Sequence, residues 1–177
     1  MILGELENSG GPMKRYLFLV VIPLFFNSCD TINNKEELKI LAEKYFEGIY
    51  GCDTLVVDEL AAPNIEVSYP VFEKIFDSPV IRGRGSLKSF VKHFCNTWKA
   101  IQFNVDETIA EGYKVAIMWR FKARNIGPIQ GKPATNEVHS WGGITLLYFN
   151  NQNLVIREIG EESTPRPIAG LSKKQIK

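Results

Sequence analysis

The sequence predicts an α+β protein, because helical and strand patterns occupy different halves of the chain. Before residue 100 the apolar side chains recur mostly at helical spacing, whereas after it they alternate with polar ones. The 177 residues are 45% hydrophobic and 23% charged, which is typical of a globular domain with a real core. The net charge is +1 and no basic stretch is dense, so we expect no nucleic-acid partner.

Three helices are expected before most of the sheet. Within residues 35–50, apolar side chains recur at helical spacing, and Gly51 follows them; they are Leu38, Leu41, Ala42, Tyr45 and Ile49. A short second helix, 54–60, can be capped by Asp53. The third, 85–100, has an apolar face that ends in Trp98. These helices should cover one side of the sheet.

Five segments read as strands, and residues 113–124 show the clearest pattern. There Val115, Ile117, Trp119 and Phe121 alternate with polar residues, which predicts one buried face. Between the helices, residues 70–79 carry two prolines and are expected to form a loop or covering segment. The strands are expected at 64–69, 101–110, 113–124, 135–149 and 154–160.

The N-terminus is typical of an export signal. Lys14 and Arg15 precede an apolar run, 16–26, that is shorter than the roughly 20 residues of a membrane-spanning helix. The run ends in Phe-Asn-Ser-Cys, which resembles a bacterial lipobox whose lipidated residue is Cys29. The true start is expected at Met13. We therefore expect a lipoprotein anchored in the cell envelope.

These features divide the chain into three parts. Residues 1–29 are the expected signal peptide, 34–163 the folded domain, and 164–177 a mobile tail with two prolines. Within the domain, Cys52 and Cys95 could pair in an oxidising compartment, but we expect two separate half-buried thiols. No cysteine–histidine cluster indicates a metal site, and no cofactor is expected.

Four segments of the chain, taken in order, form a recognisable pattern: "AEKYFEGIYGCDTLVVDELAAPNIEV", "IRGRGSLKSF", "AEGYKVAIMWRF" and "GKPATNEVHSWGGITLLYFNNQNLVIREI". Together they resemble the NTF2-like superfamily and, within it, SnoaL-like domains. The resemblance runs from about residue 36 to residue 163. It implies a cone in which a curved antiparallel sheet wraps around three N-terminal helices and leaves a cavity. Because such folds host enzymes and non-enzymes, the fold alone does not assign a function.

The ketosteroid isomerase branch of this superfamily gives one comparison. Tyr45 matches the oxyanion tyrosine of that branch, although it also fits the core face of the first helix. The general base of the branch falls at Tyr69, before Pro70, and its second oxyanion acid falls near Thr145. A tyrosine is a poor base at neutral pH, so isomerase chemistry of that type is not expected.

The SnoaL cyclase and epoxide hydrolase branches give a second comparison. Their key aspartate lies on the last strand and falls at about Gly160 here, with Ile159 at the tryptophan position. Glu158 and Glu161 lie close by, and a register shift of one residue exchanges the two sheet faces. Glu158 is the best carboxylate candidate, and the alternative is an exposed partner of Arg157.

His139 is the remaining candidate for acid–base chemistry. It shares a strand face with Trp141 and Thr145 unless Gly142 and Gly143 form a bulge. A dyad of His139 with Glu158 is the catalytic hypothesis, and a hydrogen-bonded or solvent-facing wall residue is the alternative.

Aromatic residues from several elements predict a largely apolar ligand pocket. We expect Tyr69, Trp98, Trp119 and Trp141, with Thr145, to line it, and Phe90 and Phe94 to lie in the core. The leading interpretation is an envelope-anchored domain that binds a small apolar ligand. The alternatives are a cofactor-independent lyase or isomerase that uses His139 and a carboxylate, and a non-catalytic module that dimerises through the outer sheet face.

Overall fold

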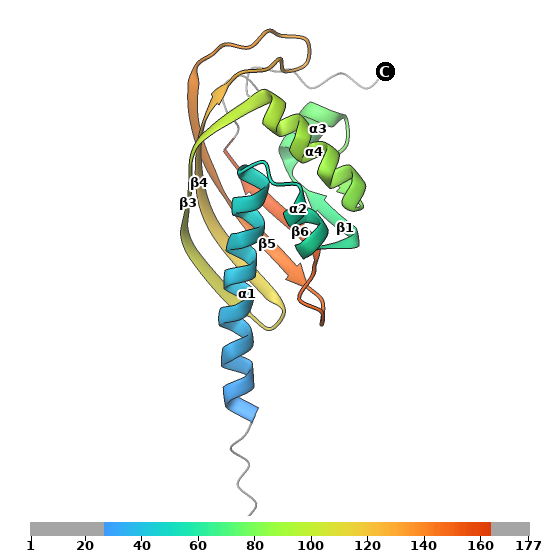
Figure 1. Cartoon of the computed structure of the whole chain (residues 1–177), viewed down its shortest axis with the longest axis vertical. Coiled ribbons are helices and arrows are strands. Elements are labelled where there is room, and N and C mark those ends of the chain that lie inside the picture. The colour runs from blue at the N-terminus through green and yellow to red at the C-terminus, as the bar shows by residue number, and fades with distance from the viewer. Residues whose placement is uncertain (1–26, 164–177) are drawn as a thin grey trace, which may run out of the picture.

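The computed structural model describes residues 27–163, which form helices packed on one six-stranded sheet (Figure 1). The predicted signal peptide and tail lie almost wholly outside these residues, and so does the side chain of Cys29. The helices are α1 (Asn27–Tyr50), α2 (Leu55–Leu60), α3 (Pro70–Phe76) and α4 (Arg84–Thr97). The strands are β1 (Ala61–Ser68), β2 (Val80–Arg82), β3 (Trp98–Glu111), β4 (Lys114–Asn125), β5 (Val138–Phe149) and β6 (Val155–Glu162).

The long helix α1 lies along the curved sheet, with α3 and α4 beyond its C-terminal end (Figure 1). Its buried positions include Leu38, Ala42, Tyr45 and Ile49, which follow the predicted helical spacing. None of the described helices is long and apolar enough to cross a membrane.

The sheet has the strand order β2-β1-β6-β5-β4-β3. Neighbouring strands are antiparallel except β1 and β6, which run parallel. In β4 the side chains of Val115, Ile117, Trp119 and Phe121 are all buried, as the alternation predicts. The pairing of β4 with β5 is continuous through Gly142 and Gly143, so the described β5 contains no bulge there.

Two local elements differ from the sequence prediction. Residues 70–79 begin with helix α3, because Pro70 occupies the first helical turn, where its missing N–H costs no hydrogen bond. The short strand β2 then pairs with β1. Trp98 is the first residue of β3 rather than part of the helix before it. The segment 70–76 therefore covers the sheet as a helix.

Cys52 and Cys95 form a disulfide, so the prediction of two separate thiols is wrong. Their Cα atoms lie 5.9 Å apart, within the normal range for a disulfide. The bond joins the turn after α1 to helix α4, which sequence spacing alone does not reveal. It fixes two helices that both contribute to the cavity described below.

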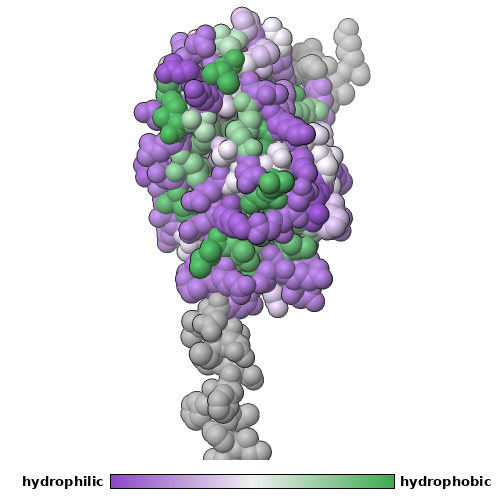
Figure 2. Space-filling model, in the orientation of Figure 1, coloured by the Kyte–Doolittle hydropathy of each residue, from purple (hydrophilic) through white to green (hydrophobic). Residues whose placement is uncertain are grey.

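The fold class is confirmed as α+β, with a curved sheet wrapped around helices. The core consists of the inner face of the sheet and the buried faces of α1, α2, α3 and α4. On the face shown in Figure 2, hydrophobic residues form separate patches between hydrophilic ones.

Candidate functional site

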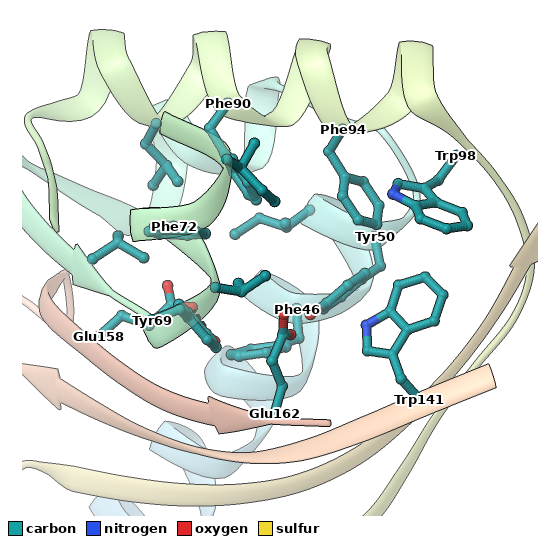
Figure 3. Close-up of a pocket in the computed structure, with 15 residues that line it drawn as sticks. Phe46, Tyr50, Tyr69, Phe72, Phe90, Phe94, Trp98, Trp141, Glu158 and Glu162 are labelled. Atoms are coloured by element: carbon teal, nitrogen blue, oxygen red, sulfur yellow. Dashed lines mark hydrogen bonds between the residues drawn. The ribbon is translucent and has the colours of Figure 1, made fainter. Parts of the chain in front are cut away.

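A cavity lies between the inner face of the sheet and helices α1, α3 and α4 (Figure 3). Its cavity volume is about 60 Å³, and about 660 Å³ of space lies between the surrounding side chains when the open mouth is included. Two glutamates supply its acidic groups. The lining residues are Phe46, Ile49, Tyr50, Val67, Tyr69, Val71, Phe72, Ile75, Leu87, Phe90, Phe94, Trp98, Trp141, Glu158 and Glu162.

Glu158 is the centre of a buried hydrogen-bond network at one side of this cavity. Its side chain comes from β6 and only 4% of the residue is exposed. The phenol of Tyr45 donates to Oε2 at 2.8 Å, and the phenol of Tyr69 donates to Oε1 at 2.6 Å. The Tyr69 oxygen also lies 2.8 Å from Thr145 Oγ1, which accepts a hydrogen bond from the Trp119 indole at 3.0 Å. Four elements therefore position one carboxyl group.

Burial controls the protonation of this network. It raises the pKa of Glu158 to about 7, although the hydrogen bonds from Tyr69 and Tyr45 act in the opposite direction. Burial, with the negative charge of Glu158, also raises the pKa values of Tyr45 and Tyr69 well above 10. Both phenols thus remain donors at neutral pH, while Glu158 can gain or lose a proton there.

Glu162 is a second carboxyl in the cavity, and the sequence analysis missed it. It follows Glu158 and Gly160 on the inner face of β6, and it is only partly exposed. Burial, and then the charge of Glu158, raise the pKa of Glu162 to about 8. The alternation of strand faces from Glu158 could have found it.

Gly160 makes room for Tyr69. A Cβ atom at this position would overlap the Tyr69 ring, which therefore lies directly over the backbone of β6. The absence of a side chain at the position of the family aspartate thus lets the phenol reach Glu158.

The structure does not bring His139 and Glu158 together, so the predicted dyad is wrong. His139 lies opposite Ala123 on β4, whereas Glu158 lies opposite Leu147 on β6. His139 and Leu147 are eight residues apart on β5, about 25 Å along an extended strand.

His139 is a buried wall residue beyond the cavity. It faces inward with Trp141, but it does not line the cavity. Its ring meets the edge of Trp98 at a centroid distance of 5.7 Å. Its Nε2 atom has no hydrogen-bond partner among the described residues, and it lies 3.7 Å from the exposed carboxylate of Glu137.

The predicted aromatic pocket is present, but some of the residues that line it differ from those predicted. Tyr69, Trp98 and Trp141 line the cavity, whereas Trp119 and Thr145 lie behind it in the hydrogen-bond network. Phe90 and Phe94, expected in the core, pack against it and also line the cavity. Helix α4 places these two rings above the cavity, one turn apart (Figure 3).

The three positions of the isomerase comparison converge in space. Tyr45, Tyr69 and Thr145 all lie within the network around Glu158. The Tyr45 phenol donates to Glu158 and does not line the cavity, so it positions the carboxyl rather than facing a ligand. The described residues contain no group of three or more His, Cys, Asp or Glu side chains that could hold a metal ion.

Comparison with known proteins agrees with this architecture. The model of the SnoaL-like domain family matches residues 42–156. No curated protein sequence matches the chain significantly.

Among solved structures, three illustrate the likeness. TsrD from Streptomyces laurentii is 22% identical with a TM-score of 0.60, covering 73% of this chain and 90% of its own. A candidate SnoaL-like polyketide cyclase from Jannaschia sp. CCS1 is 15% identical with a TM-score of 0.63, covering 76% and 89%. The epoxide hydrolase/cyclase-like enzyme SalBIII, which has a role in pyran ring formation in the polyether salinomycin, is 11% identical with a TM-score of 0.58, covering 74% and 94%. At such identities the likeness concerns the fold, and the family match extends over most of the chain: this protein belongs to the SnoaL-like domain family.

Proposed function

We propose that the domain binds a small, largely apolar molecule in the cavity between its sheet and helices α1, α3 and α4. The observation that carries this proposal is the lining itself, in which aromatic and aliphatic side chains surround two carboxyl groups. Ligand sites usually have this form, with an apolar wall and a few polar groups that fix orientation. Glu158, held by two phenols, is the polar anchor at one side of the cavity.

Extraction of the purified domain and mass spectrometry of the extract test this proposal. Ile75→Trp should fill the cavity, because Ile75 lines it from α3. Ile40→Trp is the matched control, because Ile40 is 66% exposed on α1. A small apolar molecule should accompany the wild type and the control, or be taken up by both from a compound library, and be absent from Ile75→Trp. Equal occupancy of all three proteins, or of none, contradicts the proposal.

A second candidate function is acid–base catalysis by Glu158, of the lyase or isomerase kind. The specific observation in its favour is a carboxyl with a pKa of about 7 that lies in an apolar cavity. The Glu158 carboxylate would remove a proton from carbon beside a carbonyl group. It would return that proton at another carbon in an isomerisation, or to a leaving hydroxyl group in an elimination. Such proton transfers are redox-neutral, so they need no cofactor.

Deuterium exchange into the bound ligand tests this chemistry without knowledge of the product. In deuterated water the wild type should exchange a ligand C–H group, faster as pH rises through about 7. Glu158→Gln should abolish the exchange, whereas His139→Gln should retain it, because His139 lies outside the cavity. Exchange that persists in Glu158→Gln, or ceases only in His139→Gln, would overturn this assignment.

We propose in addition that the domain is held at the cell envelope through lipidated Cys29. The signal-like sequence of residues 13–29 supports this, and so does the Cys52–Cys95 disulfide, since disulfides persist in oxidising compartments. Dimerisation through the outer sheet face stays a prediction. There Met118 and Ile144 are exposed neighbours on β4 and β5.

A further inference from the structure

The lining of the cavity contains acidic side chains but no basic ones. Its fifteen lining residues include two glutamates and eight aromatic residues, but no lysine, arginine or histidine. An anionic ligand would therefore meet carboxyl groups without a countercharge. A ligand with a positive charge would meet two potential partners.

Within residues 27–163, Glu162 is the cavity carboxyl without a hydrogen-bond or ion-pair partner. Glu158 accepts hydrogen bonds from two phenols, whereas Glu162 makes no hydrogen bond or ion pair with any residue that the structure describes. Gly143 lies opposite Glu162 on β5, and a Cβ there would come within 3.1 Å of Glu162 Cβ. The same Cβ would first meet the Glu161 backbone oxygen and the Trp119 ring, so the bare backbone at Gly143 makes room for the packing of β6 and Trp119 as well as for Glu162.

Aromatic rings surround the space in front of Glu162. Figure 3 shows its carboxyl pointing into the cavity, toward the side where Tyr50, Trp98 and Trp141 lie. The rings of Trp98 and Trp141 are 5.0 Å apart and inclined at 54°, so they form two walls of a corner. The faces of tryptophan and tyrosine rings attract organic cations, and a nearby carboxylate adds a direct charge partner.

We propose that the ligand of this cavity carries a cationic nitrogen on its apolar body, and that Glu162 is the carboxylate that receives it. This inference rests on the proposed binding function and specifies its ligand class as a hydrophobic ammonium compound. The cation lies against Glu162 and the rings of Tyr50, Trp98 and Trp141. The apolar remainder of the ligand extends toward Phe72 and Phe90.

The ionisation of Glu162 gives the binding a defined pH dependence. The titratable groups around it are Glu158 on β6, Tyr45 and Tyr50 on α1, Tyr69 between β1 and α3, and His139 behind the tryptophans on β5. Because the pKa of Glu162 is raised to about 8, most of the ligand-free protein has a protonated, uncharged Glu162 at pH 6. Affinity for a permanent cation should therefore rise with pH up to about 8 and then level off.

Three probes of similar shape separate charge from apolar binding. They are benzyltrimethylammonium, neopentylbenzene as its uncharged isostere, and phenylacetate as an anion. Titration of the mature domain at pH 8.5, followed by nuclear magnetic resonance, should show the cation binding about tenfold more tightly than its isostere. Phenylacetate should bind most weakly.

Glu162→Gln should remove the preference for the cation, while binding of neopentylbenzene is unchanged. Glu161→Gln is the matched control, because Glu161 is the neighbour of Glu162 in the sequence and its side chain is exposed on the outer face of β6. Equal affinities for the cation and the isostere in the wild type, or an unchanged preference in Glu162→Gln, overturn the inference and leave the apolar pocket standing. Failure of all three probes to bind, with no ligand found by extraction, counts against the binding function itself.

Discussion

Glu158 combines two opposing influences on a single carboxyl group. Removal from water favours its protonated form, whereas the phenols of Tyr45 and Tyr69 stabilise the carboxylate. Burial is the larger effect, and the pKa settles at about 7. A carboxyl with this value can accept and release protons at neutral pH, which an ordinary exposed glutamate does rarely.

Stability should fall as pH rises, because both cavity glutamates hold their protons more tightly in the folded state. Their pKa values rise from 4.5 to about 7 for Glu158 and about 8 for Glu162. The folded protein thus binds more protons than the unfolded chain between about pH 4.5 and 8, and the free energy of unfolding decreases through this window.

The decrease due to Glu158 should be about 3 kcal/mol. Urea denaturation at several pH values gives the free energy of unfolding as a function of pH. This free energy should fall less steeply with pH in Glu158→Gln than in the wild type. Glu161→Gln, exposed on the other strand face, should retain the wild-type slope. Identical slopes in the wild type and Glu158→Gln would refute this account.

Gly160→Ala should destabilise the fold through Tyr69. The added methyl group would overlap the Tyr69 ring and force it off β6, at a cost of about 1–3 kcal/mol. Gly85→Ala is the control, since a Cβ there meets no atom within 4 Å. Thermal unfolding should show a lower midpoint for Gly160→Ala alone, and an equal change in both variants would exclude overlap with Tyr69 as the cause.

At the scale of elements, the Cys52–Cys95 disulfide clamps α4 to the turn after α1. Its two cysteines are 43 residues apart in the sequence. Closing a loop of this length in the unfolded chain stabilises the folded state by about 4 kcal/mol in the chain-entropy model. The double variant Cys52→Ser/Cys95→Ser should lose that amount in urea denaturation. The reduced wild type should have the same free energy of unfolding as the double variant. If the oxidised wild type is no more stable than the double variant, the disulfide does not stabilise the fold.

Elements with strong periodicity could be predicted from the sequence, and those fixed by tertiary contacts could not. The alternation in β4 predicted the buried face correctly, because period two follows directly from strand geometry. Helix α3 was missed because the two prolines of residues 70–79 indicate a loop, although Pro70 is compatible with a first turn and Pro79 lies after the helix.

The site divides in the same way. Tyr45, Tyr69, Thr145 and Glu158 were all candidates, but the hydrogen bonds that unite them cross up to 113 residues of sequence. The predicted partner of Glu158, His139, fails because strand register places it eight residues away along β5. Sequence reasoning can nominate such residues, but only the register of the sheet decides which of them meet.

At the scale of the whole molecule, the proposed lipid anchor determines where the domain resides. Cys29→Ser should release the protein from membranes, because the proposed lipid is attached to that thiol. Fractionation of cells that express the full chain would measure this, with Cys52→Ser/Cys95→Ser as a control that keeps the anchor. Unchanged membrane association of Cys29→Ser would rule out the lipoprotein proposal.

The strand order has a consequence for how the molecule is made. Strand β6, which carries both cavity glutamates, is the last strand of the described chain, yet it lies between β1 and β5 in the middle of the sheet. During synthesis, β1 and β5 therefore have no partner between them until residues 155–162 have emerged. The step that joins the two halves of the sheet is the same step that delivers the acids. A partly synthesised chain therefore cannot form the complete sheet without the two glutamates. Completion of the sheet and formation of the acidic site occur in the same step.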